Sequence, residues 1–261
     1  GTVLQSSDPA LPTGSQVVVT GRELGSGCWG GWSERIRVPA DWAVPLPASL
    51  SARESMELGT AGFTAAQCIE ALELNNVVPA SGPIAVTGAS GGVGSLAIRM
   101  LSGLGYEVIA VSRKAEMSGQ LQAWGAAECW TPEQLVDKPD RPLLKADLAG
   151  AVDTVGGDML VATLRRCRQR GCVAACGMAA SERLEMTVFP FILRGVKLAG
   201  IDSAMTPAEV RQQIWQRLGG DLKPAQLGEG VTALTLEQLA ETVDQMLAGT
   251  TTGRHIVRIS S

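Results

Sequence analysis

The hydrophobic and polar positions follow two rhythms along the chain. From about residue 57 onward, apolar runs of strand length alternate with segments whose apolar residues recur at helical spacing. The predicted strands are IAVTG, EVIAVS, AGAVDTV, CVAACG and VKLAGI, and the predicted helices cover 54–74, 92–104, 117–124 and 158–169. Because repeated strand–helix units bury a sheet on both faces, this pattern predicts an α/β fold with a doubly wound parallel sheet.

The two ends of the chain are strand-rich instead. QVVVTG and ERIRVP are typical of strands, and the proline-rich stretch AVPLPAS that follows is typical of a turn. The chain closes on GRHIVRI, which is also typical of a strand. A strand needs a partner, so we expect GRHIVRI to pair with the strand-rich beginning of the chain.

Two later segments carry signals for the start of a helix. In SAMTPAEVRQQIWQRL, Thr206 is the expected N-cap, with Pro207 in the first turn and Glu209 completing a capping box. In TLEQLAETVDQML, Thr235 and Gln238 repeat the box. These signals concern local structure and point to no chemistry.

The composition narrows the class of partner. The chain has 261 residues, 45% of them hydrophobic, which is enough for one large domain or two modest ones. Lys and Arg total 22 against 26 Asp and Glu, and no basic block occurs, so we expect no nucleic-acid surface. The apolar runs are too short to span a membrane, and GTVLQSSDPA is unlike an export signal, which predicts a cytoplasmic protein without a membrane partner.

The cysteines and the single histidine make a metal site unattractive. Six cysteines occur without C-x-x-C spacing, mostly among apolar neighbours, which fits a reducing compartment. Cys172 and Cys176 lie in a predicted buried strand and are best explained as small core residues. His255 is the only histidine, so a histidine-rich metal site cannot form, and we expect no bound metal.

The stretch PIAVTGASGGVGSLAIRM places a glycine turn between a strand ending at Thr87 and a helix beginning near Gly92. Such a turn directs backbone N–H groups and the positive end of a helix dipole to one point, which favours an anion. A-S-G-G-V-G matches the dinucleotide fingerprint except for Ala89 at its first glycine. Gly91 would let the backbone approach a pyrophosphate, and Gly94 would let the helix pack closely on the strand.

The end of the next strand indicates which dinucleotide. Enzymes that prefer NAD usually carry Asp or Glu there, to accept the ribose 2′-hydroxyl. EVIAVS ends instead in Ser112, Arg113 and Lys114. A hydroxyl and two cations suit a 2′-phosphate, which a carboxylate would repel. The residues therefore predict NADP(H) as the cofactor.

Five separated stretches together resemble one family. They match the zinc-independent quinone oxidoreductase-like branch of the medium-chain dehydrogenase/reductase superfamily, in the group that contains acrylyl-CoA reductases. In chain order, the stretches are GTAGFTA, TGASGGVG, DTVGG, CVAACGMA and PFILRGVKLAGIDS.

The resemblance implies a Rossmann nucleotide-binding domain inserted into a GroES-like β-barrel. We therefore expect a Rossmann domain over 57–220 and a partial GroES-like domain over 1–56 and 221–261. Members of this family begin further upstream, with barrel strands and a tyrosine that lies beside the cofactor and substrate. The only tyrosine here is Tyr106, at the start of a strand, so we expect that tyrosine and the front half of the barrel to be absent from this sequence.

The resemblance also assigns cofactor roles. It places the pyrophosphate on Ser90, Gly91, Gly92 and Val93, and the 2′-phosphate on Ser112, Arg113 and Lys114. Near the nicotinamide it suggests Met178, Ile192, Ser203 and Thr64. Met178 and Ile192 read equally well as core residues, and no residue is an obvious catalytic acid.

The activity implied by the resemblance is NADPH-dependent reduction of a carbon–carbon double bond conjugated to a carbonyl. The substrate would be acrylyl-CoA or another small enone, or a quinone. The alternative is a truncated module that binds NADP(H), or senses redox state, without turnover. A homodimer is also implied, and KLAGI would supply an exposed strand edge for it.

Overall fold

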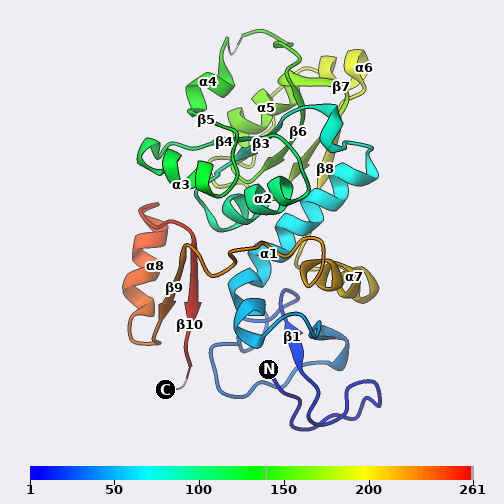
Figure 1. Cartoon of the computed structure of the whole chain (residues 1–261), viewed down its shortest axis with the longest axis vertical. Helices are drawn as coiled ribbons and strands as arrows, with labels where there is room; N and C mark the ends of the chain where they lie inside the picture. Colours follow the sequence, from blue (N-terminus) through cyan, green and yellow to red (C-terminus); the bar gives the residue numbers. More distant parts are fainter. Residues whose placement is uncertain (139, 260–261) are drawn as a thin grey trace. The chain divides into compact units, whose positions relative to one another are not determined.

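The strands predicted in the middle of the chain form one parallel sheet in the computed structural model, which describes residues 1–138 and 140–259 (Figure 1). The strand order is β5-β4-β3-β6-β7-β8, and every neighbouring pair is parallel. The prediction of a doubly wound parallel sheet is therefore confirmed. The strands are β3 Ile84–Thr87, β4 Val108–Val111, β5 Glu128–Trp130, β6 Leu148–Asp153, β7 Cys167–Ala175 and β8 Lys197–Gly200.

Helices cover this sheet on both faces because its winding reverses between β3 and β6. From β3 the chain moves outward through α2 (Gly92–Gly103) to β4, and from β6 it moves the opposite way through α5 (Gly157–Arg166) to β7. Since parallel crossovers are right-handed, these two helices lie on opposite faces. The remaining helices of this part are α1 Ala52–Leu74, α3 Ser118–Ala123, α4 Pro132–Val136 and α6 Phe189–Arg194.

The core follows the two-residue period of the strands. Ala85, Ile109, Ala151 and Val173 lie in register on four neighbouring strands and belong to one buried cluster with Leu160 of α5. The opposite face receives α1, where a Cβ at Gly150 would lie 3.1 Å from Leu72 Cδ2. Nearly continuous apolar strands are thus explained by burial on both faces.

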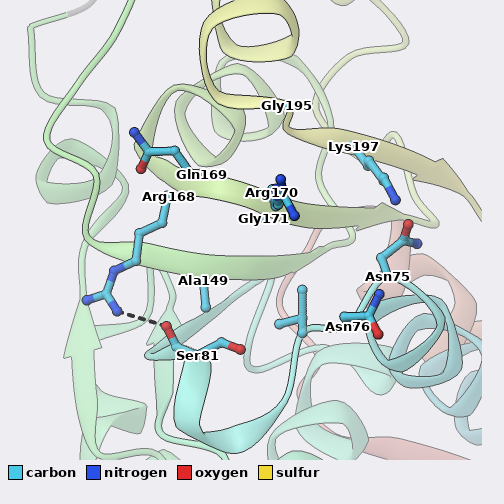
Figure 2. A pocket seen from close by; sticks show the side chains of 11 residues that line it. Asn75, Asn76, Ser81, Ala149, Arg168, Gln169, Arg170, Gly171, Gly195 and Lys197 are labelled. Atoms are coloured by element: carbon cyan, nitrogen blue, oxygen red, sulfur yellow. Dashed lines mark hydrogen bonds between the residues drawn. The ribbon is translucent and has the colours of Figure 1, made fainter.

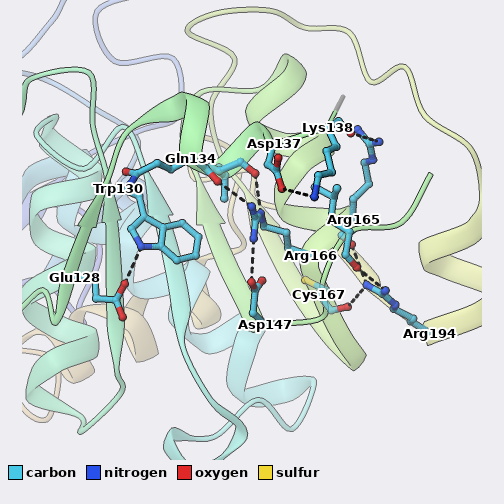
Figure 3. A network of polar contacts seen from close by, with 12 residues as sticks. Glu128, Trp130, Gln134, Asp137, Lys138, Asp147, Arg165, Arg166, Cys167 and Arg194 are labelled. Atoms are coloured by element: carbon cyan, nitrogen blue, oxygen red, sulfur yellow. Dashed lines mark hydrogen bonds and ion pairs between the residues drawn. The ribbon is translucent and has the colours of Figure 1, made fainter. Parts of the chain in front are cut away.

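Two arginines tie the helices α4, α5 and α6 to the sheet (Figure 3). Arg166 is buried, forms a 2.9 Å ion pair with Asp147, and donates to the carbonyl oxygen of Leu135 at 2.7 Å. Arg194 donates to the carbonyl oxygens of Arg165 and Leu144 at 2.9 and 2.7 Å. These cations complete the hydrogen bonding of helix ends, so their role is structural.

The chain divides into two compact units. One comprises 64–201 and holds the sheet, and the other comprises 1–63 with the described residues from Asp202 on. The boundaries predicted from the sequence, 56/57 and 220/221, differ from these because contacts assign α7 (Ala208–Leu218) to the second unit. The assignment of domains to 1–56, 57–220 and 221–261 stays a prediction.

The second unit contains two strand pairs. Strand β1 (Val17–Val19) is antiparallel to β2 (Ala43–Pro45), and β9 (Val231–Leu234) is parallel to β10 (Arg254–Val257) with α8 (Leu239–Leu247) between them. The expected pairing of GRHIVRI with the beginning of the chain is therefore wrong. A local strand–helix–strand unit supplies its partner, because VTAL also forms a strand. The pairs are consistent with the partial GroES-like barrel that the resemblance implies.

Three further expectations about local structure are corrected. No strand forms over ERIRVP, whereas part of the proline-rich stretch pairs with β1 as β2. The helix predicted over 158–169 ends at Arg166, because β7 begins at Cys167. Thr206 does not cap α7, since its hydroxyl donates to the carbonyl oxygen of Asp202 at 2.9 Å and Pro207 is the N-cap residue.

Candidate nucleotide site

The glycine turn between β3 and α2 has the predicted geometry. Gly88 adopts a φ of 60°, in the left-handed region that glycine tolerates, and the Gly91 N–H closes the turn on the Gly88 carbonyl oxygen at 2.9 Å. Helix α2 begins at Gly92, and no side chain caps its start in the described part of the chain. The first turn of α2 therefore offers backbone N–H groups and a positive dipole end to an anion.

Gly94 fixes how closely α2 approaches this turn. A Cβ at Gly94 would overlap the Gly88 carbonyl oxygen and lie 2.9 Å from the Ala89 Cα, both of them backbone atoms that cannot move aside. The role predicted for Gly94, close packing of helix against strand, is confirmed by this geometry. A Cβ at Gly91 would lie 3.2 Å from the Gly88 carbonyl oxygen, a tight contact with a backbone atom, so a side chain at this position would crowd the turn.

The structure brings the basic segment beside the glycine turn. The Ser112 hydroxyl donates to the Ser90 hydroxyl at 3.4 Å, and the Lys114 N–H donates to the Ser112 hydroxyl at 3.1 Å. Arg113 between them is exposed. The residues predicted to bind the pyrophosphate and those predicted to bind the 2′-phosphate thus lie at the ends of the neighbouring strands β3 and β4, joined through the Ser112 and Ser90 hydroxyls.

Behind the turn, a buried carboxylate joins the two strands where the winding reverses. Asp153 ends β6 and accepts a 2.6 Å hydrogen bond from the Thr87 hydroxyl at the end of β3, and a second at 2.8 Å from the Gly156 N–H. The Thr154 hydroxyl donates to the Thr87 carbonyl oxygen at 2.9 Å. Burial raises the pKa of the Asp153 carboxyl, and these hydrogen bonds oppose the shift.

The loop after β7 packs on the loop after β6. Its Cys176 N–H donates to the Asp153 carbonyl oxygen at 2.9 Å, and the Ala180 N–H donates to the Val155 carbonyl oxygen at 2.9 Å. A Cβ at Gly156 would lie 3.2 Å from the Met178 Cα. Ligands of doubly wound sheets bind at the carboxyl ends of the strands, beside the point where the order reverses, and both loops lie there.

The residues expected near the nicotinamide are placed unequally. Met178 belongs to the loop just described and is 70% exposed, and Ile192 on α6 is 75% exposed. Both exposures argue against the reading of these side chains as core residues. Thr64 is buried on α1 in the same unit, whereas Ser203 belongs to the other unit. Tyr106 is buried and donates to the Val77 carbonyl oxygen at 2.8 Å, which is a structural contact.

Three further residues belong to this site that the sequence-based predictions did not include: Thr87, Asp153 and Gly156. Their signal was the stretch DTVGG directly after a buried strand, because polar residues at a strand's carboxyl end lie at the ligand-binding edge. The pairing of Thr87 with Asp153 spans 66 positions, so no local spacing could reveal it.

No group of three or more His, Cys, Asp or Glu side chains is arranged to hold a metal ion within residues 1–138 and 140–259. Of the helices in those ranges, none is long and apolar enough to cross a bilayer. The site therefore consists of a backbone cradle, hydroxyls, the basic segment and the buried Thr87–Asp153 pair.

Known proteins resemble this chain in both sequence and fold. Residues 92–219 match the family model described as zinc-binding dehydrogenase. The chain is 42% identical over 261 residues to acrylyl-CoA reductase AcuI of Ruegeria pomeroyi, covering all of this chain and 79% of that protein.

Two solved structures have the same fold at similar identity. The yhdH oxidoreductase from Salmonella enterica in complex with NADP is 44% identical, with a TM-score of 0.96 over all of this chain and 80% of that one. The Bacillus subtilis protein yhfP with NAD bound is 43% identical, with a TM-score of 0.96 over 99% of this chain and 79% of that one.

Proposed function

The chain belongs to the zinc-independent quinone oxidoreductase-like branch of the medium-chain dehydrogenase/reductase superfamily, in the group of acrylyl-CoA reductases, and from this we propose that it reduces conjugated carbon–carbon double bonds with NADPH. It is an NADP(H)-dependent oxidoreductase acting on a small molecule. The finer proposal is that the substrate is an α,β-unsaturated carbonyl compound, acrylyl-CoA or a small enone.

One observation carries the choice of cofactor. The Ser112–Ser90 contact joins the basic segment to the glycine turn, so a dinucleotide whose pyrophosphate lies on α2 would present its ribose 2′-position to Ser112, Arg113 and Lys114. None of these three residues is a carboxylate that would repel a 2′-phosphate. The lack of a side chain at Gly91 and the start of α2, which no side chain of the described residues caps, also fit a pyrophosphate.

The residues of this chain bind and orient rather than react. When bound, NADPH would supply a hydride to the β-carbon of the substrate, and a proton from solvent or from an acid outside this sequence would complete the α-carbon. Ser90, Gly91, Gly92 and Val93 would hold the pyrophosphate, and the loops that carry Gly156 and Met178 would form the surface beyond it. Met178, Ile192, Thr64 and Ser203 are proposed to lie near the nicotinamide. Once cofactor and substrate cover them, the apolar side chains of Met178 and Ile192 would help to exclude water from the hydride path.

Two further features belong to this proposal. Among the described strands β8 lies at the edge of the sheet, and this edge could pair with a second copy, which supports a homodimer. The six cysteines are all free thiols, which supports a reducing, cytoplasmic location.

NADPH oxidation at 340 nm tests the activity, with acrylyl-CoA, a small enone and a small quinone supplied in turn. We expect turnover with the first two and formation of the saturated product. Turnover with the quinone alone would replace the enone proposal by quinone reduction. NADPH binding without turnover on any of the three would favour the alternative of a nucleotide-binding module.

A further inference from the structure

A cavity lined by several polar and basic residues lies where the parallel strands begin, at the opposite ends of the strands from the glycine turn. It has a volume of about 600 Å³ and is lined by the loop after α1 and by the starts of β7 and β8 (Figure 2). Every residue that lines it belongs to the unit 64–201. This volume falls in the range of pockets that bind small molecules.

The charged side chains that line this cavity are all cations. Arg168, Arg170 and Lys197 line it, together with Asn75, Asn76, Gln169 and Ser81, and no acidic side chain does. Arg168 donates to the Ser81 carbonyl oxygen at 2.8 Å, which holds its guanidinium in place. For Arg170 and Lys197 no ion pair is found among the described residues. Figure 2 shows Arg168, Arg170 and Lys197 among the side chains that line this cavity, so three cations border one space.

The backbone conformation that places Arg170 in the cavity lining is energetically unfavourable. The pairing of β6 with β7 changes register between Leu148 and Gly150, so residues 168–171 bulge out of the ladder. Within this bulge Arg170 has a φ of 62°, a left-handed conformation that glycine adopts readily and arginine does not. A strained conformation that presents an unpaired cation to a cavity is typical of a binding site rather than of a core contact.

We propose that this cavity binds a small phosphorylated anion carrying a diphosphate or two phosphoryl groups. Three cations call for a multiply charged ligand, and guanidinium groups bind phosphate oxygens through paired donors. Asn76 and Gln169 add amide groups to the lining, and an amide N–H can donate to a phosphate oxygen. The site is separate from the glycine turn, because it lies where β7 and β8 begin and the turn lies at the other ends of the parallel strands. The proposal is independent of the proposed activity.

Calorimetric titration with inorganic pyrophosphate tests the site directly, with orthophosphate and succinate as comparison anions. We expect saturable pyrophosphate binding that persists in Gly91→Val, in which the glycine turn is blocked, with weaker binding of orthophosphate and weaker still of succinate. Arg170→Gln and Lys197→Gln should each weaken pyrophosphate about tenfold, as loss of one charge-assisted contact does. The matched control Arg141→Gln removes an exposed cation outside the cavity and should leave binding unchanged.

Two further variants separate this site from its alternatives. Gly91→Val blocks the glycine turn and should leave pyrophosphate binding intact. Arg170→Gly removes both the charge and the strain, so it should lose binding while its unfolding midpoint stays equal to that of the wild type or rises. The proposal is overturned if pyrophosphate does not saturate, if succinate binds equally well, if Gly91→Val abolishes binding while Arg170→Gln does not, or if Arg170→Gly lowers the midpoint.

Discussion

The two ends of the parallel strands offer anions different hydrogen-bonding groups. We call the side of the sheet where the strands end its carboxyl edge and the side where they begin its amino edge. At the carboxyl edge, the donors are backbone N–H groups at the start of α2 and the hydroxyls of Ser90 and Ser112, with Arg113 exposed nearby. At the amino edge, they are the side chains of Arg168, Arg170 and Lys197. A backbone cradle binds an anion only if the anion can come close to the N–H groups, so one added Cβ can block it. A side-chain cluster depends on charge, and each substitution should weaken it by degrees.

The largest effect is expected from closing the backbone cradle. Gly94→Val would drive a side chain into the Gly88 carbonyl oxygen and the Ala89 Cα, so α2 must shift. We expect a loss of roughly 1–3 kcal/mol in the free energy of unfolding, together with loss of NADPH binding. Denaturant unfolding measures the free energy of unfolding, and a fluorescence titration measures NADPH binding.

Gly103→Ala is the matched control for this substitution. It lies in the same helix with no atom within 4 Å of the new Cβ, so the free energy of unfolding should change by less than about 1 kcal/mol. If Gly94→Val were as stable as Gly103→Ala and still bound NADPH, close packing of α2 on the turn would not be required.

A smaller, selective effect is expected from the side-chain part of the same edge. Arg113→Ala should weaken NADPH by about 1.5–3 kcal/mol, the usual contribution of a charge-assisted hydrogen bond, and should leave NADH nearly unchanged. Fluorescence titrations with both cofactors measure this difference. Arg141→Ala, which removes an exposed arginine between α4 and β6, serves as the control. Equal losses for NADPH and NADH would mean that Arg113 does not contact the 2′-phosphate.

The smallest effect concerns the buried carboxyl that supports the cradle. Because burial raises the folded-state pKa of Asp153 above its unfolded value, the folded state binds the proton more tightly. The contribution of Asp153 to stability therefore increases as the pH falls through the folded pKa toward the ordinary value of 3.8, and decreases as the pH rises through the same window. Asp153→Asn cannot titrate.

Thermal unfolding of both proteins from pH 7 down to pH 4 checks this sign. The midpoint of the wild type minus that of Asp153→Asn should increase on acidification. A difference that decreases would show that the hydrogen bonds from Thr87 and Gly156 outweigh burial and hold the pKa below its usual value.

Much of the cradle could be predicted because it is local. The strand ending at Thr87, the glycine turn and the start of α2 lie within one short stretch, and glycine at 91 and 94 is needed for reasons of space that the spacing already expresses. The parallel sheet was predictable for a related reason, since burial on both faces produces continuous apolar strands. Which strands pair is less predictable from the sequence. Strand β10 pairs with β9, and the residues of β9 show no clear strand pattern.

Apolar periodicity and glycine spacing in this chain were enough to identify the α/β class, the dinucleotide turn and the basic segment after β4, because each depends on neighbours a few residues apart. The Thr87–Asp153 hydrogen bond, the exposure of Met178 and Ile192, and the gathering of Arg168, Arg170 and Lys197 around one cavity required the folded chain. These features join residues that are distant in sequence, and strand order and register, which no local pattern encodes, determine which of them meet.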